Sequence, residues 1–130
     1  MITVVVADDH PMFRDGLSFT LDQAPDIHVV AQACDGHQAL AAVSEHHPDV
    51  VVMDLAMPGM DGLEATSLIA TEGIHVLVLT FSEDDASVLA AMRAGALGYL
   101  RKGADPDQVV SAVRATAAGH VSVGYSNNSG

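Results

Sequence analysis

The stretch that most constrains the fold is Val50-Val51-Val52-Met53-Asp54, a short apolar run, mostly β-branched, that ends in a carboxylate. Because the valines stand side by side instead of alternating with polar residues, the run is typical of a strand buried on both faces, as in parallel sheets. Asp54 then lies at the carboxyl end of this strand. In open α/β sheets ligands bind outside the carboxyl ends of the strands, so Asp54 is the first candidate for a functional residue.

Apolar runs alternate with helical patterns along most of the chain. The first helical pattern begins at Pro11, a residue that suits the first turn of a helix. It continues with Phe13, Leu17 and Leu21, which are spaced four apart on one face. Five strand–helix pairs imply right-handed crossovers and a parallel sheet with helices on both faces. The sequence therefore predicts an α/β, doubly wound, five-stranded parallel sheet, (βα)5, with the strand order 2-1-3-4-5. The expected strands are residues 2–7, 27–33, 50–53, 75–79 and 98–100.

The later helices and the tail carry more local signals. Asp61 and Asp105 are expected to cap helices, and Pro106 follows the second cap at a position where proline is favoured. The tail from His120 to Gly130 lacks periodicity and is rich in Ser, Asn and Gly, which is typical of a linker or a cloning tail. The inner faces of two helices are expected to carry Leu63, Leu68 and Ile69, and Val88, Leu89 and Met92.

Composition excludes several classes of protein. The formal charge is −12, with 17 acidic and 5 basic residues, which argues against binding of nucleic acid by this domain alone. Cys34 is the single cysteine, so no internal disulfide forms. The start of the chain shows no signal peptide and no apolar run approaches the length of a membrane span. We therefore expect a soluble cytoplasmic protein without a membrane partner.

Polar residues end four of the predicted strands. Because the carboxyl ends of parallel strands meet at one edge of a sheet, these side chains are expected to converge. Three close carboxylates repel one another, so either one of them takes up a proton or the cluster binds a cation. Oxygen ligands favour Mg²⁺ or Mn²⁺ over zinc. A carboxylate, a metal, an ammonium and a hydroxyl together suit phosphoryl transfer. The converging residues are Asp8, Asp9, Asp54, Thr80 and Lys102.

Four fragments follow one another along the chain: Asp8-Asp9-His10-Pro11, Met53 to Gly62, Leu79-Thr80, and Ala94 to Lys102. Together, in this order, they resemble the receiver domain of bacterial two-component response regulators. The resemblance runs from Ile2 to about Gly119, so residues 1–119 are the expected receiver domain. The first fragment and the Gly-Tyr-Leu before the lysine are most similar to the subfamily whose receivers precede a LuxR-type (NarL/FixJ) helix-turn-helix domain.

This resemblance implies a flavodoxin-like (CheY-like) fold and a role for each residue at the strand ends. A sensor histidine kinase is the implied phosphoryl donor, and the protein itself is no enzyme beyond slow self-dephosphorylation. A conformational switch then controls an output, and phosphorylation is often accompanied by homodimerisation in the family. DNA would be bound only through a C-terminal helix-turn-helix domain absent from this chain. Asp54 is the implied phosphoacceptor, and the implied Mg²⁺ ligands are Asp8, Asp9, Asp54 and the Ala56 backbone carbonyl. Thr80 and Lys102 are implied to contact the phosphoryl group, and Thr80 and Tyr99 are implied to act as the switch.

Two side chains and three alternative functions qualify this interpretation. Phe81 stands where many receivers have a small residue, and its ring is expected to screen the acyl phosphate from water. His10 is expected in a solvated loop, with a position beside the acidic site as the alternative. An Asp-nucleophile phosphatase is disfavoured because Ala56 occupies the place of its second aspartate, and a flavin site because Asp8 and Asp9 would repel a phosphate. An unphosphorylated receiver-like adaptor is disfavoured because all five converging polar residues, Asp8, Asp9, Asp54, Thr80 and Lys102, are present.

Overall fold

Strands and helices alternate as the sequence predicts. A computed structural model describes residues 1–57, 62–81 and 85–123. Each of the first five strands is followed by a helix, so the predicted (βα)5 pattern is confirmed. In chain order the elements are β1 (Ile2–Ala7), α1 (Pro11–Gln23), β2 (Ile27–Ala33), α2 (Gly36–His46), β3 (Val50–Met53), α3 (Gly62–Thr71), β4 (His75–Thr80), α4 (Asp85–Arg93), β5 (Gly98–Arg101), α5 (Pro106–Ala117) and β6 (Ser122–Val123).

The strands form one parallel sheet in the order β2-β1-β3-β4-β5-β6. The order of the first five strands is the predicted one. β6 pairs with β5 at the edge of the sheet and was not predicted, because two residues are too few to show a periodic pattern. β1 and β3 run in register, with Ala7 opposite Met53, so the residues that follow them, Asp8 and Asp54, leave the sheet at the same level.

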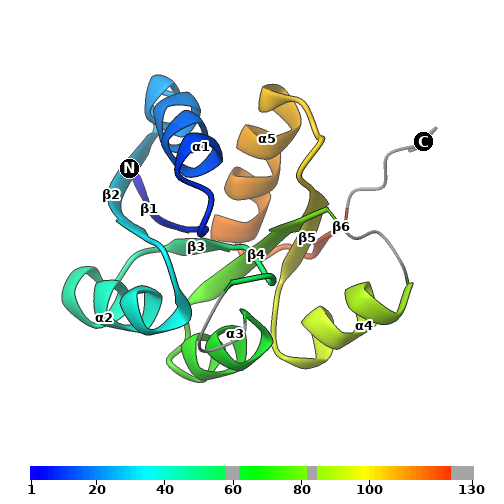
Figure 1. The fold of residues 1–130 in the computed structure, drawn as a ribbon. Coiled ribbons are helices and arrows are strands. Elements are labelled where there is room, and N and C mark those ends of the chain that lie inside the picture. The colour runs from blue at the N-terminus through cyan, green and yellow to red at the C-terminus, as the bar shows by residue number, and fades with distance from the viewer. Residues whose placement is uncertain (58–61, 82–84, 124–130) are drawn as a thin grey trace.

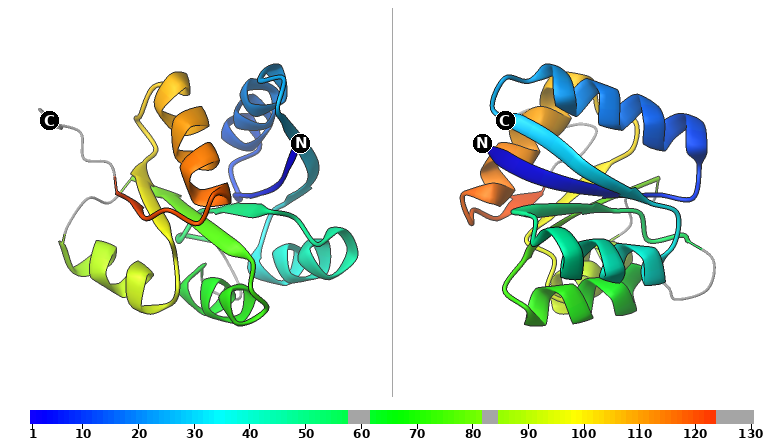
Figure 2. Two further views of the ribbon diagram at one scale, coloured as in Figure 1. Left: turned by 180° about the vertical axis from the view of Figure 1, so that it is seen from behind. Right: turned by 90° about the vertical axis from the view of Figure 1, so that its left-hand side faces the viewer.

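Helices cover both faces of the sheet. Figure 1 shows α1 and α5 on one face and α2, α3 and α4 on the other, and the side view in Figure 2 separates the two layers. Within β3, Val51 and Met53 pack into the core beneath α2, α3 and α4, whereas Val50 and Val52 pack beneath α1 and α5. Because alternate side chains point to opposite faces of a strand, a strand between two helix layers buries every residue, which explains the unbroken valine run.

Two leucines predicted to face the core lie outside it. Leu68 is 43% exposed and Leu89 is 50% exposed. Each is one residue, about 100° around the helix, from a neighbour that is buried, Ile69 in α3 and Val88 in α4. The apolar pattern was too broad to fix the rotation of either helix.

The helix-capping predictions have different outcomes. Asp105 caps α5 in a reciprocal arrangement, since its side chain accepts from the Gln108 backbone N–H and its own N–H donates to the Gln108 side chain, both at 3.0 Å. The predicted cap at Asp61 lies outside the described residues. None of the described helices has the length and apolar character that crossing a membrane requires.

Candidate functional site

Backbone hydrogen bonds continue past the strand ends and position the predicted site residues. The Asp54 N–H donates to the Ala7 carbonyl at 3.0 Å, so the chain after β3 stays attached to β1. The Lys102 N–H donates to the Thr80 carbonyl at 2.8 Å, which joins the ends of β4 and β5 in the same way. Residues far apart in the sequence therefore reach one edge of the sheet on rigid elements.

Lys102 joins two buried carboxylates. Its Nζ lies 2.7 Å from Asp8 Oδ2 and 3.2 Å from Asp54 Oδ2. The three side chains are at most 4% exposed. Buried charges are tolerated only when they are paired, and here one ammonium faces two carboxylates, so the group keeps a net negative charge that favours a further cation.

The hydrogen bonding of Asp9 shows whether the acidic residues could hold a divalent cation. Asp8, Asp9, His10 and Asp54 each offer a ligand atom, and these atoms lie within 4.8 Å of one another. Asp9 Oδ1 is buried and, within the described part of the chain, accepts no hydrogen bond. An orphaned carboxylate oxygen beside two others fits a hard divalent cation such as Mg²⁺.

The remaining predicted residues are Ala56, Thr80 and Tyr99. The Ala56 N–H donates to Asp54 Oδ1 at 3.2 Å, which places this loop residue at the site, and the role of its carbonyl stays a prediction. Thr80 ends β4 and is buried. Tyr99 is 2% exposed and packs in the core on the α3–α4 side of the sheet, so its ring points inward. The switching roles of Thr80 and Tyr99 also stay predictions.

His10 lies at the acidic site, which was the alternative to a solvated loop position. Its Nδ1 is 3.0 Å from Asp8 Oδ1, 3.1 Å from Asp9 Oδ1 and 4.0 Å from Asp54 Oδ2. The candidate metal ligands, which were predicted to be oxygens only, therefore include one nitrogen, His10 Nδ1. The signal was present in the sequence, since His10 directly follows the two aspartates.

Two aromatic rings flank the Lys102 ammonium. Nζ lies 4.7 Å from the centre of the Phe13 ring and 5.0 Å from that of the Phe81 ring, within the range of cation–π attraction. Phe13 was assigned only to the apolar face of α1, so its contact with the site was missed. Phe81 is 73% exposed, and its ring forms part of the outer surface beside the site.

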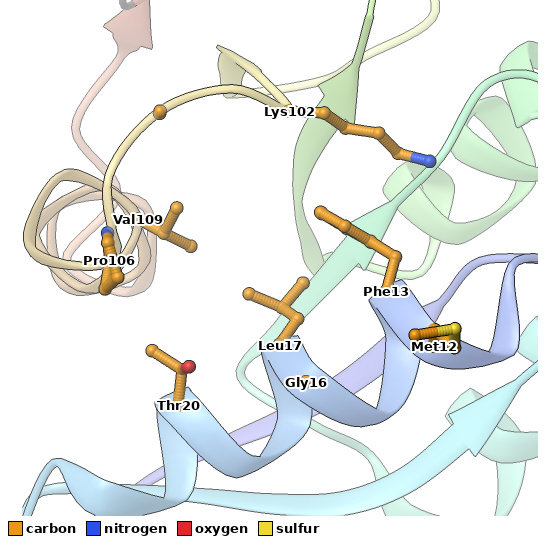
Figure 3. Close-up of a pocket in the computed structure, with 9 residues that line it drawn as sticks. Met12, Phe13, Gly16, Leu17, Thr20, Lys102, Pro106 and Val109 are labelled. Carbon is orange, nitrogen blue, oxygen red and sulfur yellow. The ribbon is translucent and has the colours of Figure 1, made fainter.

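An apolar pocket adjoins this cluster between α1 and the start of α5. Its volume is about 310 Å³, and Phe13 and Leu17 line it from α1. Figure 3 shows the Lys102 side chain and Phe13 at one end of the pocket, with Thr20 at the other. The Lys102 side chain therefore belongs both to this pocket and to the acidic site.

Arg14 and Gly62 support the site from outside it. Arg14 Nη1 donates to the Asp8 backbone carbonyl at 3.0 Å and its Nε donates to Gln32 Oε1 at 3.0 Å, which ties α1 to the ends of β1 and β2. A Cβ at Gly62 would lie 2.5 Å from Leu55 Cα and 2.6 Å from the Asp54 carbonyl oxygen. Only glycine lets α3 begin this close to the backbone that carries Asp54.

A parallel sheet with a buried aspartate pair and a lysine at its carboxyl edge defines a receiver-type domain. Comparison with known families agrees, because residues 4–114 match the sequence profile of the response regulator receiver domain. The chain belongs to this family, and its relatives place it with the LuxR/NarL-type response regulators.

Individual relatives show the extent of the similarity. The chain is 43% identical over 121 residues to the transcriptional regulatory protein LiaR of Bacillus subtilis (strain 168), covering 92% of this chain and 57% of LiaR. It is 36% identical to the nitrate/nitrite response regulator protein NarL of Escherichia coli (strain K12), covering 92% of this chain and 56% of NarL. The chain thus spans little more than half the length of these relatives.

Solved structures confirm the fold. The signal receiver domain of a NarL response regulator from Mycobacterium tuberculosis is 36% identical and superimposes with a TM-score of 0.88, covering 92% of this chain and 98% of that one. A LuxR-family response regulator from Aurantimonas sp. SI85-9A1 is 37% identical, with a TM-score of 0.89 and coverage of 94% and 89%.

Proposed function

We propose that this domain accepts a phosphoryl group on Asp54 from a sensor histidine kinase, in a reaction that depends on Mg²⁺. The observation that carries the proposal is the buried Lys102 ammonium, which lies 3.2 Å from Asp54 Oδ2 and 2.7 Å from Asp8 Oδ2. A fixed ammonium beside a carboxylate is arranged to meet the negative charge of an incoming phosphoryl group.

Each residue then has a distinct task. An Asp54 oxygen forms a bond to phosphorus while the bond from phosphorus to the kinase histidine nitrogen breaks, which leaves an acyl phosphate. Lys102 and the Thr80 hydroxyl bond to phosphoryl oxygens. Asp8, Asp9, Asp54 and the Ala56 carbonyl would hold Mg²⁺, which would neutralise phosphoryl charge when bound. The domain is a phosphoacceptor, and its own catalysis is limited to slow self-dephosphorylation.

The phosphoryl group acts as a switch in this proposal. Thr80 moves toward it, and the inward-pointing Tyr99 responds on the α4–β5 side of the fold. The relatives include transcriptional regulatory proteins that are longer than this chain, so we propose that the output is transcription, through a C-terminal DNA-binding domain, in the cytoplasm. Phosphorylation-dependent homodimerisation is part of the same proposal.

Intact-mass spectrometry after incubation with acetyl phosphate tests the proposal. With Mg²⁺ the wild-type protein is expected to gain one phosphoryl group, and without Mg²⁺ it is expected to gain none. Asp54→Ala should remain unmodified, whereas Asp107→Ala, a change at an exposed aspartate in the first turn of α5, should behave as wild type. A wild-type protein that stays unmodified with Mg²⁺, or an Asp54→Ala variant that is modified equally, would contradict the proposal.

A further inference from the structure

We propose that His10 supplies a nitrogen ligand to the divalent cation held by Asp8, Asp9 and Asp54. The site would then favour a transition-metal ion such as Co²⁺ over Mg²⁺ more strongly than its carboxylates alone would. This inference rests on the proposed function only in requiring that the acidic site binds a divalent cation.

The spacing of the donor atoms is the first argument. Ligands about 2.1 Å from an octahedral ion lie about 3.0 Å from their neighbours and about 4.2 Å from the ligand opposite. His10 Nδ1 lies 3.0 Å from Asp8 Oδ1 and 3.1 Å from Asp9 Oδ1. It lies 4.0 Å from Asp54 Oδ2. These separations match the donors of a single coordination shell.

The hydrogen bonding of Asp9 is the second argument. Nδ1 carries at most one proton, yet it lies almost equally close to two carboxylate oxygens. Nδ1 makes a hydrogen bond with Asp8 Oδ1, whereas Asp9 Oδ1 is buried and accepts none from the described residues. A cation bound by Nδ1 and both oxygens satisfies all three atoms, which a single proton does not.

The position of His10 in the fold leaves its ring available for this role. His10 is the residue before α1, but its side chain does not cap the helix. Its backbone N–H donates to Asp8 Oδ1 at 2.8 Å, which holds the residue against the site independently of the ring. The side chain is 58% exposed, so the ring lies at the border between the acidic site and solvent.

The nature of the donor determines which ions benefit. Carboxylate and carbonyl oxygens suit Mg²⁺, whereas imidazole nitrogen suits the later first-row metal ions, whose affinities also rise along the series. A site with one imidazole and three carboxylates therefore gains affinity for Co²⁺ from His10 and gains little for Mg²⁺. The ratio of the two affinities is the quantity that the inference predicts.

Isothermal titration calorimetry with CoCl₂ and with MgCl₂ tests this, using wild type, His10→Asn, His28→Asn and Asp54→Asn. Asparagine is a favoured helix N-cap, so His10→Asn is expected to fold. His28 is the matched control, since its Nδ1 lies 3.5 Å from Asp22 Oδ1 in an exposed pair away from the site. Circular dichroism checks that each variant is folded.

The expected result is a change in metal preference. His10→Asn should weaken Co²⁺ binding at the Asp54-dependent site by at least about tenfold, because even outer-shell partners of metal ligands are worth about 10- to 100-fold in affinity. Its Mg²⁺ affinity should stay within about twofold of wild type, by the preference of that ion for oxygen. His28→Asn should bind both ions as wild type does.

Two results would overturn the inference while leaving the proposed function intact. One is an unchanged Co²⁺ affinity in His10→Asn. The other is tighter binding of both ions, which would mean that the ring competes with the cation. If wild type and Asp54→Asn instead bind both ions equally, the Asp54 carboxylate is not a ligand, so the coordination proposed here is wrong and the metal dependence of the proposed function loses its basis as well.

Discussion

Replacing Lys102 with methionine should destabilise the protein by leaving two buried carboxylates without their shared partner. At the observed separations of 2.7 Å and 3.2 Å, and with an effective dielectric constant of about 20, the attractions are about 6 and about 5 kcal/mol. The desolvation of Lys102 offsets part of this. Removing one partner of a buried ion pair costs about 3–5 kcal/mol, and we expect Lys102→Met to fall in this range.

Urea denaturation at pH 7 with EDTA measures the effect. With a slope of about 1–3 kcal/mol per molar urea, a loss of about 3 kcal/mol lowers the midpoint by about 1–3 M. Arg114→Met is the matched control, because Arg114 and Asp26 form an ion pair at 2.9 Å whose side chains are 47% and 46% exposed. The control should lose only a small fraction of the stability that Lys102→Met loses, since exposed pairs contribute little.

Two further measurements distinguish charge from packing. Adding Mg²⁺ should stabilise Lys102→Met more than wild type, because a cation bound to the native carboxylates replaces part of the lost charge. Combining Lys102→Met with Asp54→Asn should recover part of the loss, since one unpaired carboxylate is then removed. A Lys102→Met protein as stable as wild type, or one indifferent to both changes, would refute the electrostatic reasoning.

Four other predictions follow from local geometry. Gly62→Ala should cost about 1–3 kcal/mol in urea denaturation, because its Cβ meets backbone at 2.5 Å; Gly16→Ala, with nothing within 4 Å of the added Cβ, should instead stabilise by about 0.5–1 kcal/mol. Phe81→Ala should shorten the lifetime of the phosphorylated form severalfold by admitting water, and an unchanged decay of intact mass would exclude screening by the ring. The hydrogen bond from Arg114 holds the pKa of Asp26 below its usual 3.8, although desolvation opposes the shift. This small stabilisation is therefore present above pH 3.8 and lost as the pH falls through the lowered pKa. Arg114→Ala should therefore be less stable than wild type above pH 3.8, and the difference should disappear as the pH falls through the lowered pKa of Asp26. Urea midpoints measured as a function of pH check this.

The strand order and the meeting of the acidic residues were predictable because both depend on repeated patterns. Consecutive valines in β3 indicated burial on two faces, and parallel strands bring their carboxyl ends to one edge. The convergence of Asp8, Asp54 and Lys102 on one edge of the sheet followed from this topology without knowledge of any side-chain conformation. β6 escaped prediction because its two residues are held by pairing with β5 and not by a local preference.

Contacts that depend on side-chain direction were not predictable. Phe13 lies on the predicted apolar face of α1, but only the packing of α1 against the sheet shows that its ring reaches Lys102. For His10 the sequence indicated nearness to the acidic site only as an alternative, because the direction of the ring, with Nδ1 facing Asp8 and Asp9, depends on the side-chain conformation. The rotations of α3 and α4 were likewise fixed by packing, which is why Leu68 and Leu89 were assigned to the wrong face.

The distance along the chain between the residues of the site has a consequence for quality control. Asp54 and Lys102 are 48 positions apart, and they meet because β4 and β5 lie beside β3 in the completed sheet. A partly unfolded chain contains every one of these residues and yet has no assembled site. The phosphoryl acceptance that we propose would therefore be confined to molecules whose sheet is intact, and damaged or incomplete molecules would be excluded from it without any separate mechanism to inactivate them.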